Sequence, residues 1–148
     1  MTPRTKAQND QVRSQSRARL VQAARAMFAS KGFFACKVGD IAREADMSQG
    51  SVYWHFSSKE KILQEILAEG FGAIEMMTAE IADASGTSRR KIDLLIERTL
   101  ALYTEHGDFA RILGTLMGHG RQELLASLGF NMAEIGGRYH ANLGRVFA

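Results

Sequence analysis

Apolar residues recur at helical spacing along almost the whole chain, and no stretch alternates between apolar and polar residues as a half-buried strand would. The clearest example is the set Leu20, Val21, Ala24 and Phe28, which falls on one face of a helix. Of the 148 residues, 45% are hydrophobic, which is enough for a packed core. The pattern therefore predicts an all-α protein.

Breaks in this periodicity divide the chain into seven expected helices behind a polar segment, residues 1–13, which we expect to be a disordered basic arm. Gly32 suits the positive φ that ends many helices, and residues 84–88 (ASGTS) are interpreted as a linker. The long fourth helix is expected to be capped by Ser57 or Ser58, with capping-box spacing from Ser57 to Glu60. The first three helices are expected over residues 14–30, 38–45 and 49–55, and the fourth ends at about residue 83. The fifth lies between residues 88 and 106, the sixth covers 108–117, and the seventh runs from about 121 to the end.

Positive charge is concentrated in the first part of the chain, although the formal net charge is only +3. Residues 1–65 hold eleven Lys and Arg against six Asp and Glu, and the remainder holds eight against ten. This asymmetry indicates an anionic partner for the first part.

Several classes of protein are excluded by what the sequence lacks. The single cysteine, Cys36, cannot form an internal disulfide, and the four histidines show no metal-binding spacing such as HExxH. A serine-nucleophile elbow is also missing, and no apolar run approaches the roughly 20 residues that span a bilayer. We therefore expect a cytoplasmic protein that is not an enzyme, holds no metal or cofactor, and does not enter a membrane.

The most informative segment is a pair of short helices joined by a tight turn, over about residues 37–56. Residues 38–45 and 49–55 are expected to be helical, and Ser48 between them is a good N-cap. Val52 and Phe56 can face inward. This length and patterning is typical of a helix-turn-helix, whose second helix presents its outward side chains to DNA. The outward residues here are Gln49, Gly50, Ser51, Tyr53, Trp54 and His55.

The motifs in and around this segment are RLVQAA (19–24), MF (27–28), GF (32–33), VGDIA (38–42), SQGSVYWHF (48–56) and KE (59–60). Together they resemble the DNA-binding domain of TetR-family transcriptional repressors. The resemblance covers about residues 14–74, and the stretch from VGDIAREA to YWHF looks like the branch that regulates multidrug efflux pumps. It implies a three-helix helix-turn-helix domain, joined by the long fourth helix to a helical bundle over residues 75–148.

The resemblance also implies which residues contact DNA. Gln49 and Ser51 would meet base edges, and Gly50 would let the helix approach closely. Tyr53 and His55 would donate to phosphates. The expected DNA-binding residues are Lys37, Val38, Gly39, Ser48, Gln49, Gly50, Ser51, Tyr53, Trp54, His55 and Lys59.

Some of these positions have structural alternatives or depart from the family pattern. Tyr53 and Trp54 could be packed aromatic residues; otherwise Trp54 would contact the DNA backbone or a thymine methyl group. Lys59 would sit on a phosphate. Where this chain has Cys36 and Lys37, the family usually has Ser or Thr; Lys37 cannot cap through an acceptor atom but can supply a charge to phosphate. Cys36 is interpreted as a buried apolar residue rather than a redox switch.

In the family that the chain resembles, the remaining helices bind a small apolar or cationic effector and form a homodimer. The candidate ligand-binding residues are Phe71, Met77, Leu102, Tyr103, His106, Phe109 and Met117, whose alternative role is ordinary bundle core. Glu75, Glu105 and Glu123 are the acidic residues that could meet a cation, or they are solvated.

The resemblance therefore implies a ligand-responsive repressor that binds double-stranded operator DNA, controls an efflux pump, and is released when a ligand tilts the fourth helix. Family members are usually longer, and residues 120–148 reach only the helix before the pair that forms the dimer. The standard dimer interface is thus expected to be incomplete. The alternative is a non-autonomous protein that pairs with a full-length relative.

Overall fold

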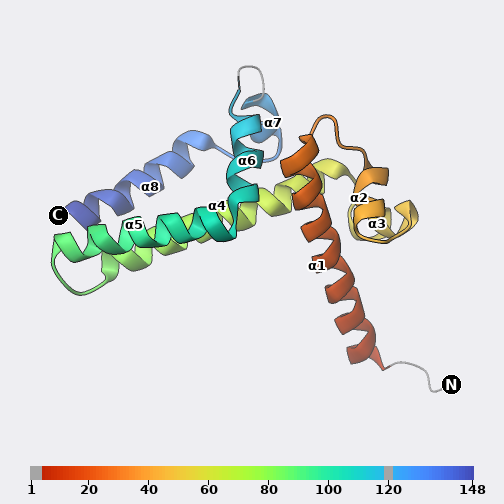
Figure 1. Ribbon diagram of the computed structural model, residues 1–148, viewed down its shortest axis with the longest axis horizontal. Coiled ribbons are helices and arrows are strands. Elements are labelled where there is room, and N and C mark those ends of the chain that lie inside the picture. Colours follow the sequence, from red (N-terminus) through yellow and green to blue (C-terminus); the bar gives the residue numbers. More distant parts are fainter. Residues whose placement is uncertain (1–4, 119–121) are drawn as a thin grey trace. The chain divides into compact units, whose positions relative to one another are not determined.

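The computed structural model describes residues 5–118 and 122–148, and over them the chain forms eight α-helices and no strand (Figure 1). The all-α prediction is confirmed. The chain divides into two compact units, Met1–Ile66 and Leu67–Ala148. The predicted division lay between residues 74 and 75. The helices are α1 (Lys6–Lys31), α2 (Val38–Glu44), α3 (Gln49–His55), α4 (Lys59–Asp83), α5 (Ser88–Glu105), α6 (Gly107–Leu116), α7 (Gln122–Ser127) and α8 (Met132–Phe147).

The first unit consists of α1, α2, α3 and the start of α4. In Figure 1, α2 and α3 form a compact pair, and α2 packs against both α1 and α3. Its core is filled by one apolar face from each helix and by the link after α1, which explains why the periodicity could be read from sequence. The buried residues include Leu20, Ala24, Phe28, Phe33, Cys36, Ile41, Ala42, Val52, Phe56, Ile62, Leu63 and Ile66.

The prediction of a disordered arm over residues 1–13 is wrong from Lys6 onward, because α1 begins there. Thr5 Oγ1 accepts from the Gln8 N–H (3.3 Å) and Gln8 Oε1 accepts from the Thr5 N–H (2.9 Å), which is a reciprocal capping box. Residues 5–15 are all exposed, so this part of the helix leaves no apolar stripe in the sequence. Residues 1–4 lie outside the described part of the chain.

The second unit contains the rest of α4 together with α5 to α8. Near the end of α4, Ile81 and Ala82 are buried with Val146 of α8, and Ile92 and Leu95 of α5 pack on them. A second buried set comes from α6, α7 and the residue after α7, namely Phe109, Ile112, Leu116, Leu125 and Leu128. Within the described residues, no helix has both the length and the apolar character needed to cross a membrane.

The last part of the chain differs from prediction. The expected single last helix is two, α7 and α8, because Gly129 adopts φ +85° and Asn131 then caps α8 by accepting from the Ala133 and Glu134 N–H groups. At the start of α4, Ser58, one of the two predicted caps, accepts from the backbone N–H of Lys61 (3.3 Å). The predicted linker is observed over residues 84–87, and Ser88, its expected last residue, is the first residue of α5.

Candidate nucleic-acid interface and ligand cavity

Helix α3 is positioned by a tight turn after α2. Asp46 adopts φ +53°, a left-handed conformation that Asp tolerates better than most residues, and the Met47 N–H donates to the Ala42 carbonyl (2.9 Å). Ser48 then caps α3, with its Oγ accepting from the Ser51 N–H (3.1 Å). Val52 is buried, so the opposite face of α3 is turned outward.

The outward face of α3 carries the side chains that the sequence predicted. Tyr53 and Trp54 are 54% and 62% exposed, so neither is a packed core aromatic residue. Gln49, Gly50 and Ser51 are exposed as well. A short helix with an exposed polar and aromatic face is the form that enters a DNA major groove.

A groove of about 590 Å³ lies along one side of α3, between it and the start of α2. Among the predicted DNA-binding residues, it is lined by Lys37, Val38, Gly39, Gln49, Tyr53 and Lys59. Within the groove the Gln49 amide lies against Gly39, where a Cβ atom would be 2.8 Å from Nε2. Gly39 therefore contributes the space that the Gln49 side chain occupies.

The start of α2 is stabilised without a capping side chain at Lys37. The Asp40 carboxylate accepts from the Lys37 N–H (2.9 Å) and pairs with Lys31 Nζ (2.8 Å). These two hydrogen bonds, that of Lys31 first, hold the pKa of Asp40 below its usual value. The Lys37 side chain is exposed and can offer its charge to an anion, as the sequence predicted.

On the other side of α3, a second groove runs beside α1 and is lined by Ser16, Met47, Ser48, Gly50, Ser51, Trp54 and His55. Two arginines of α1 reach α3 here. The Arg13 guanidinium lies 4.6 Å from the centre of the Trp54 ring. Arg17 donates to the His55 carbonyl (3.1 Å), stacks over Phe56 (4.0 Å), and pairs with Glu65 of α4.

These arginines were not predicted as positioning residues, because their contacts join positions up to 48 residues apart that no local pattern connects. They also act on His55. Partial burial first, and then the positive charges of Arg17 and Arg13, lower the pKa of His55. A phosphate at this groove would meet cationic or hydrogen-bond-donating groups from both α1 and α3.

Lys59 is placed differently from the prediction. Its ammonium donates to the carbonyls of Phe33 and Cys36, both at 2.8 Å, and lies 4.3 Å from the centre of the Phe33 ring. Two of its three N–H bonds therefore hold the link between α1 and α2 against α4, rather than pointing to DNA. Cys36 is buried, and burial is the main reason that the pKa of its thiol is raised.

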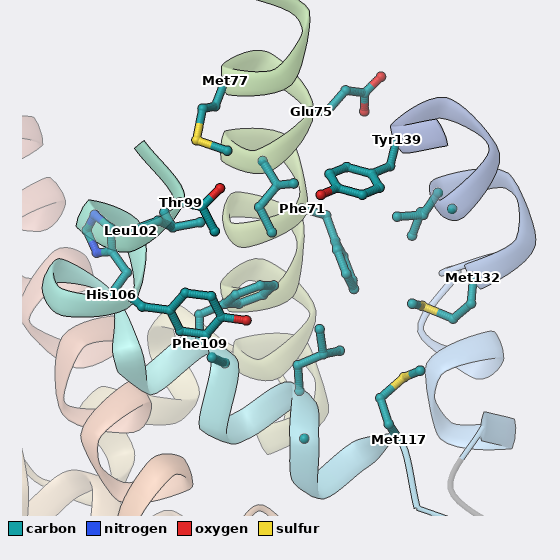
Figure 2. A pocket seen from close by; sticks show the side chains of 17 residues that line it. Phe71, Glu75, Met77, Thr99, Leu102, His106, Phe109, Met117, Met132 and Tyr139 are labelled. Carbon is teal, nitrogen blue, oxygen red and sulfur yellow. The ribbon is translucent and has the colours of Figure 1, made fainter. Parts of the chain in front are cut away.

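The second unit encloses a largely apolar cavity of about 480 Å³, within the size range of small-molecule sites (Figure 2). All seven predicted ligand-binding residues line it: Phe71, Met77, Leu102, Tyr103, His106, Phe109 and Met117. The lining residues that were not predicted include Thr99 of α5, four residues of α6 and α4 (Ile74, Ala110, Leu113 and Gly114) and Gly136 of α8. Three larger side chains of α8 were also missed: Met132, Ile135 and Tyr139. The spacing of those three, i, i+3 and i+7, is the signal that could have found them.

The aromatic side of this cavity is closely packed. The Phe71 ring meets the Phe109 ring edge to face (5.5 Å between centres) and the Phe130 ring at 5.4 Å. Phe109 in turn lies directly on the backbone of α4, because a Cβ at Gly70 would be 2.1 Å from its Cε2 atom.

Several polar contacts join α8 to α4, and the first of them involves a residue that lines the cavity. Arg138 Nε lies 3.1 Å from Glu75 Oε1, and Arg145 pairs with Asp83. Between them, Asn142 donates to the hydroxyl of the fully buried Thr78 (3.1 Å). Of the three acidic residues considered from sequence, Glu75 is the one that lines the cavity.

Comparison with known proteins identifies the first unit. Residues 20–66 match the family described as "Bacterial regulatory proteins, tetR family". The chain is 28% identical over 102 residues to the uncharacterized HTH-type transcriptional regulator YdgC of Bacillus subtilis, covering 66% of this chain and 52% of that protein. It is 36% identical over 79 residues to the HTH-type transcriptional repressor KstR2 of Mycobacterium tuberculosis, covering 53% of this chain and 38% of the relative.

The alignments thus span about half, or less, of these relatives. The solved structure of the ketosteroid transcriptional regulator KstR2 of M. tuberculosis matches 87% of this chain and 59% of its own, with a TM-score of 0.66 and 26% identity. The motifs, the helix-turn-helix geometry and these similarities agree: residues 20–66 carry the helix-turn-helix segment of the tetR family of bacterial regulatory proteins.

Proposed function

We propose that this chain is a transcriptional repressor that binds operator DNA through α3 and is released by a small molecule. The observation that carries the DNA-binding part is the capped, outward-facing α3, with a groove on each side of it. Support comes from the names of the relatives, which include HTH-type regulators and a repressor. A family of regulatory proteins also agrees with the expectation that the chain is not an enzyme.

In this proposal α3 enters the major groove with Gln49 and Ser51 toward base edges. Tyr53, Lys37 and His55 meet phosphates on the two sides of the helix, and Arg13 orients Trp54. Lys59 acts indirectly, by fixing the link before α2. Gly39 also acts indirectly, through Gln49.

The cavity of the second unit is proposed as the effector site. Its apolar lining and flexible methionines suit a hydrophobic ligand, and one relative is named a ketosteroid regulator. This name favours a hydrophobic metabolite over the efflux-pump assignment, which rests on the resemblance of one stretch. A homodimer is proposed as the binding form, because two reading helices on two half-sites add their affinities.

Salt-titrated binding of the full chain to DNA from upstream of its own gene tests the proposal. A specific site should bind at least about a thousandfold more tightly than unrelated DNA, with affinity falling steeply as salt increases. Equal affinity for both DNAs would overturn sequence-specific regulation. Sedimentation in the presence of the DNA measures the number of chains bound.

A further inference from the structure

We infer that the cavity of the second unit selects an uncharged, largely apolar small molecule and disfavours cations, because the ion pair of Arg138 with Glu75 removes the negative charge that a cation would need. The inference rests on the proposed function, since it assumes that this cavity is the effector site. It decides between the two ligand classes that the sequence left open, apolar and cationic.

The lining of the cavity contains one carboxylate among the residues that the structure describes, that of Glu75. The other polar groups are the hydroxyls of Thr99, Tyr103 and Tyr139 and the imidazole of His106. Hydroxyl groups satisfy a ligand carbonyl or hydroxyl but cannot balance a full positive charge. Glu75 is therefore the residue on which charge selection depends.

Glu75 is already partnered. Its Oε1 atom lies 3.1 Å from Arg138 Nε, and Figure 2 shows Glu75 at the edge of the cavity. Arg138 is held beside it by the contacts that Asn142 and Arg145 make one and two turns further along α8, with Thr78 and Asp83. A cation approaching Glu75 must displace this guanidinium or remain next to it, and both reduce its attraction.

The aromatic lining by itself does not separate the two ligand classes. Phe71, Phe109 and Tyr139 offer ring surfaces that can hold either an apolar group or a quaternary ammonium. A charged ligand also loses hydration on entering a cavity with so apolar a lining, and without a free counter-charge that loss is not recovered. The neutralised carboxylate therefore decides in favour of the uncharged ligand.

Three fluorescent probes that share one anthracene ring test this: 9-anthracenemethanol (neutral), anthracen-9-ylmethyl-ammonium (cationic) and 9-anthracenecarboxylate (anionic). Binding to the full chain is measured by titration. The neutral probe should bind at least about tenfold more tightly than the cation. In Arg138→Gln the cation should gain about fivefold, as expected for one unscreened charge near the surface, while the neutral probe changes less than about twofold.

The matched control is Arg145→Gln, which breaks the other ion pair between α8 and α4, that with Asp83. It should leave the preference for the neutral probe unchanged, because Asp83 does not line the cavity. Glu75→Gln should give the cation no gain. A cation that binds wild-type protein as well as the neutral probe, or that gains equally in both arginine variants, overturns the inference alone. Failure of all three probes to bind overturns the cavity as an effector site, and the inference with it.

Discussion

Gly39 of α2 and Gln49 of α3 meet so closely that a Cβ atom on Gly39 would lie 2.8 Å from the Gln49 amide nitrogen. The neighbour is the end of a flexible side chain, so Gly39→Ala should move the amide and leave the fold intact. We expect a roughly five- to 150-fold loss of affinity for the specific site, and little change on unrelated DNA, since one bidentate base contact is worth about 1–3 kcal/mol. Titrations with both DNAs measure this.

The control is the double variant Gly39→Ala, Gln49→Ala. If Gly39 acts through Gln49, the alanine at 39 should cost nothing further once the amide is absent. A loss of affinity in the double variant that equals the sum of the losses in the two single variants would contradict this relationship.

Arg17 joins three helices of the first unit through the His55 carbonyl, the Phe56 ring and Glu65. Arg17→Ala should lower the free energy of unfolding by about 1–2 kcal/mol, chiefly through the lost carbonyl hydrogen bond and stacking, because a part-exposed ion pair contributes little. Arg17→Lys should recover only part of this, since an ammonium lacks the planar fork. Urea unfolding followed by circular dichroism tests it, with the exposed Arg19→Ala as control; an equal loss in the control would refute the assignment.

Lys59 and Tyr53 should separate stability from DNA binding. Lys59→Met leaves the Phe33 and Cys36 carbonyls without their donor, so we expect a loss of about 1–3 kcal/mol in unfolding free energy and a small change in salt slope. Tyr53→Phe should do the reverse, weakening binding to all DNA sequences without affecting stability. Lys61→Met, at an exposed position two residues along, is the control. A Lys59 variant with unchanged stability but a reduced salt slope would support the original prediction that Lys59 contacts a phosphate directly.

His55 should make stability and DNA affinity respond oppositely to pH. Burial, Arg17 and Arg13 lower its pKa in the folded protein, so its contribution to stability is complete above its unfolded value of about 6.5 and is lost as pH falls below that. A DNA phosphate favours the protonated ring, so the affinity for DNA should rise as the pH falls over the same interval. Both dependences should be shallower in His55→Gln. Identical pH profiles for the variant and the wild type would exclude His55 from both effects.

Gly70 and Gly72 of α4 offer a matched pair. A Cβ at Gly70 would overlap the Phe109 ring at 2.1 Å, whereas one at Gly72 meets nothing within 4 Å. Gly70→Ala should therefore destabilise the protein by about 1–3 kcal/mol and displace Phe109 from the cavity lining. Gly72→Ala should stabilise it by about 0.5–1 kcal/mol. Thermal unfolding compares them, and the reverse order would show that Phe109 does not rest on α4.

Sequence reasoning succeeded where local rules decide the structure. The boundaries of α3 match because Ser48 supplies a cap that a four-residue window reveals. The seven predicted ligand-binding residues line one cavity because helical spacing places them on the faces of α4, α5 and α6 that border it, although spacing alone could not distinguish cavity from packed core.

Sequence reasoning failed where the contacts of a side chain depend on residues that are distant in the sequence. Lys59 was predicted to sit on a phosphate, because the sequence does not reveal that the fold brings two loop carbonyls to its ammonium group. Arg17 had no sequence neighbour that indicated Glu65. The start of α1 was missed for a different reason: its first turns bury nothing, and only the Thr5–Gln8 capping box marks them.

The polar contacts between α4 and α8 also fix how far α8 can slide. Residues 138, 142 and 145 each meet a specific partner, and a slip by one turn would carry Asn142 away from the buried Thr78 hydroxyl. The axial register of α8 is therefore set before any ligand arrives. In the proposed effector site, adjustment to molecules of different shape would then fall to the rotamers of Met77, Met117 and Met132, which are long enough to refill the space that a smaller molecule leaves.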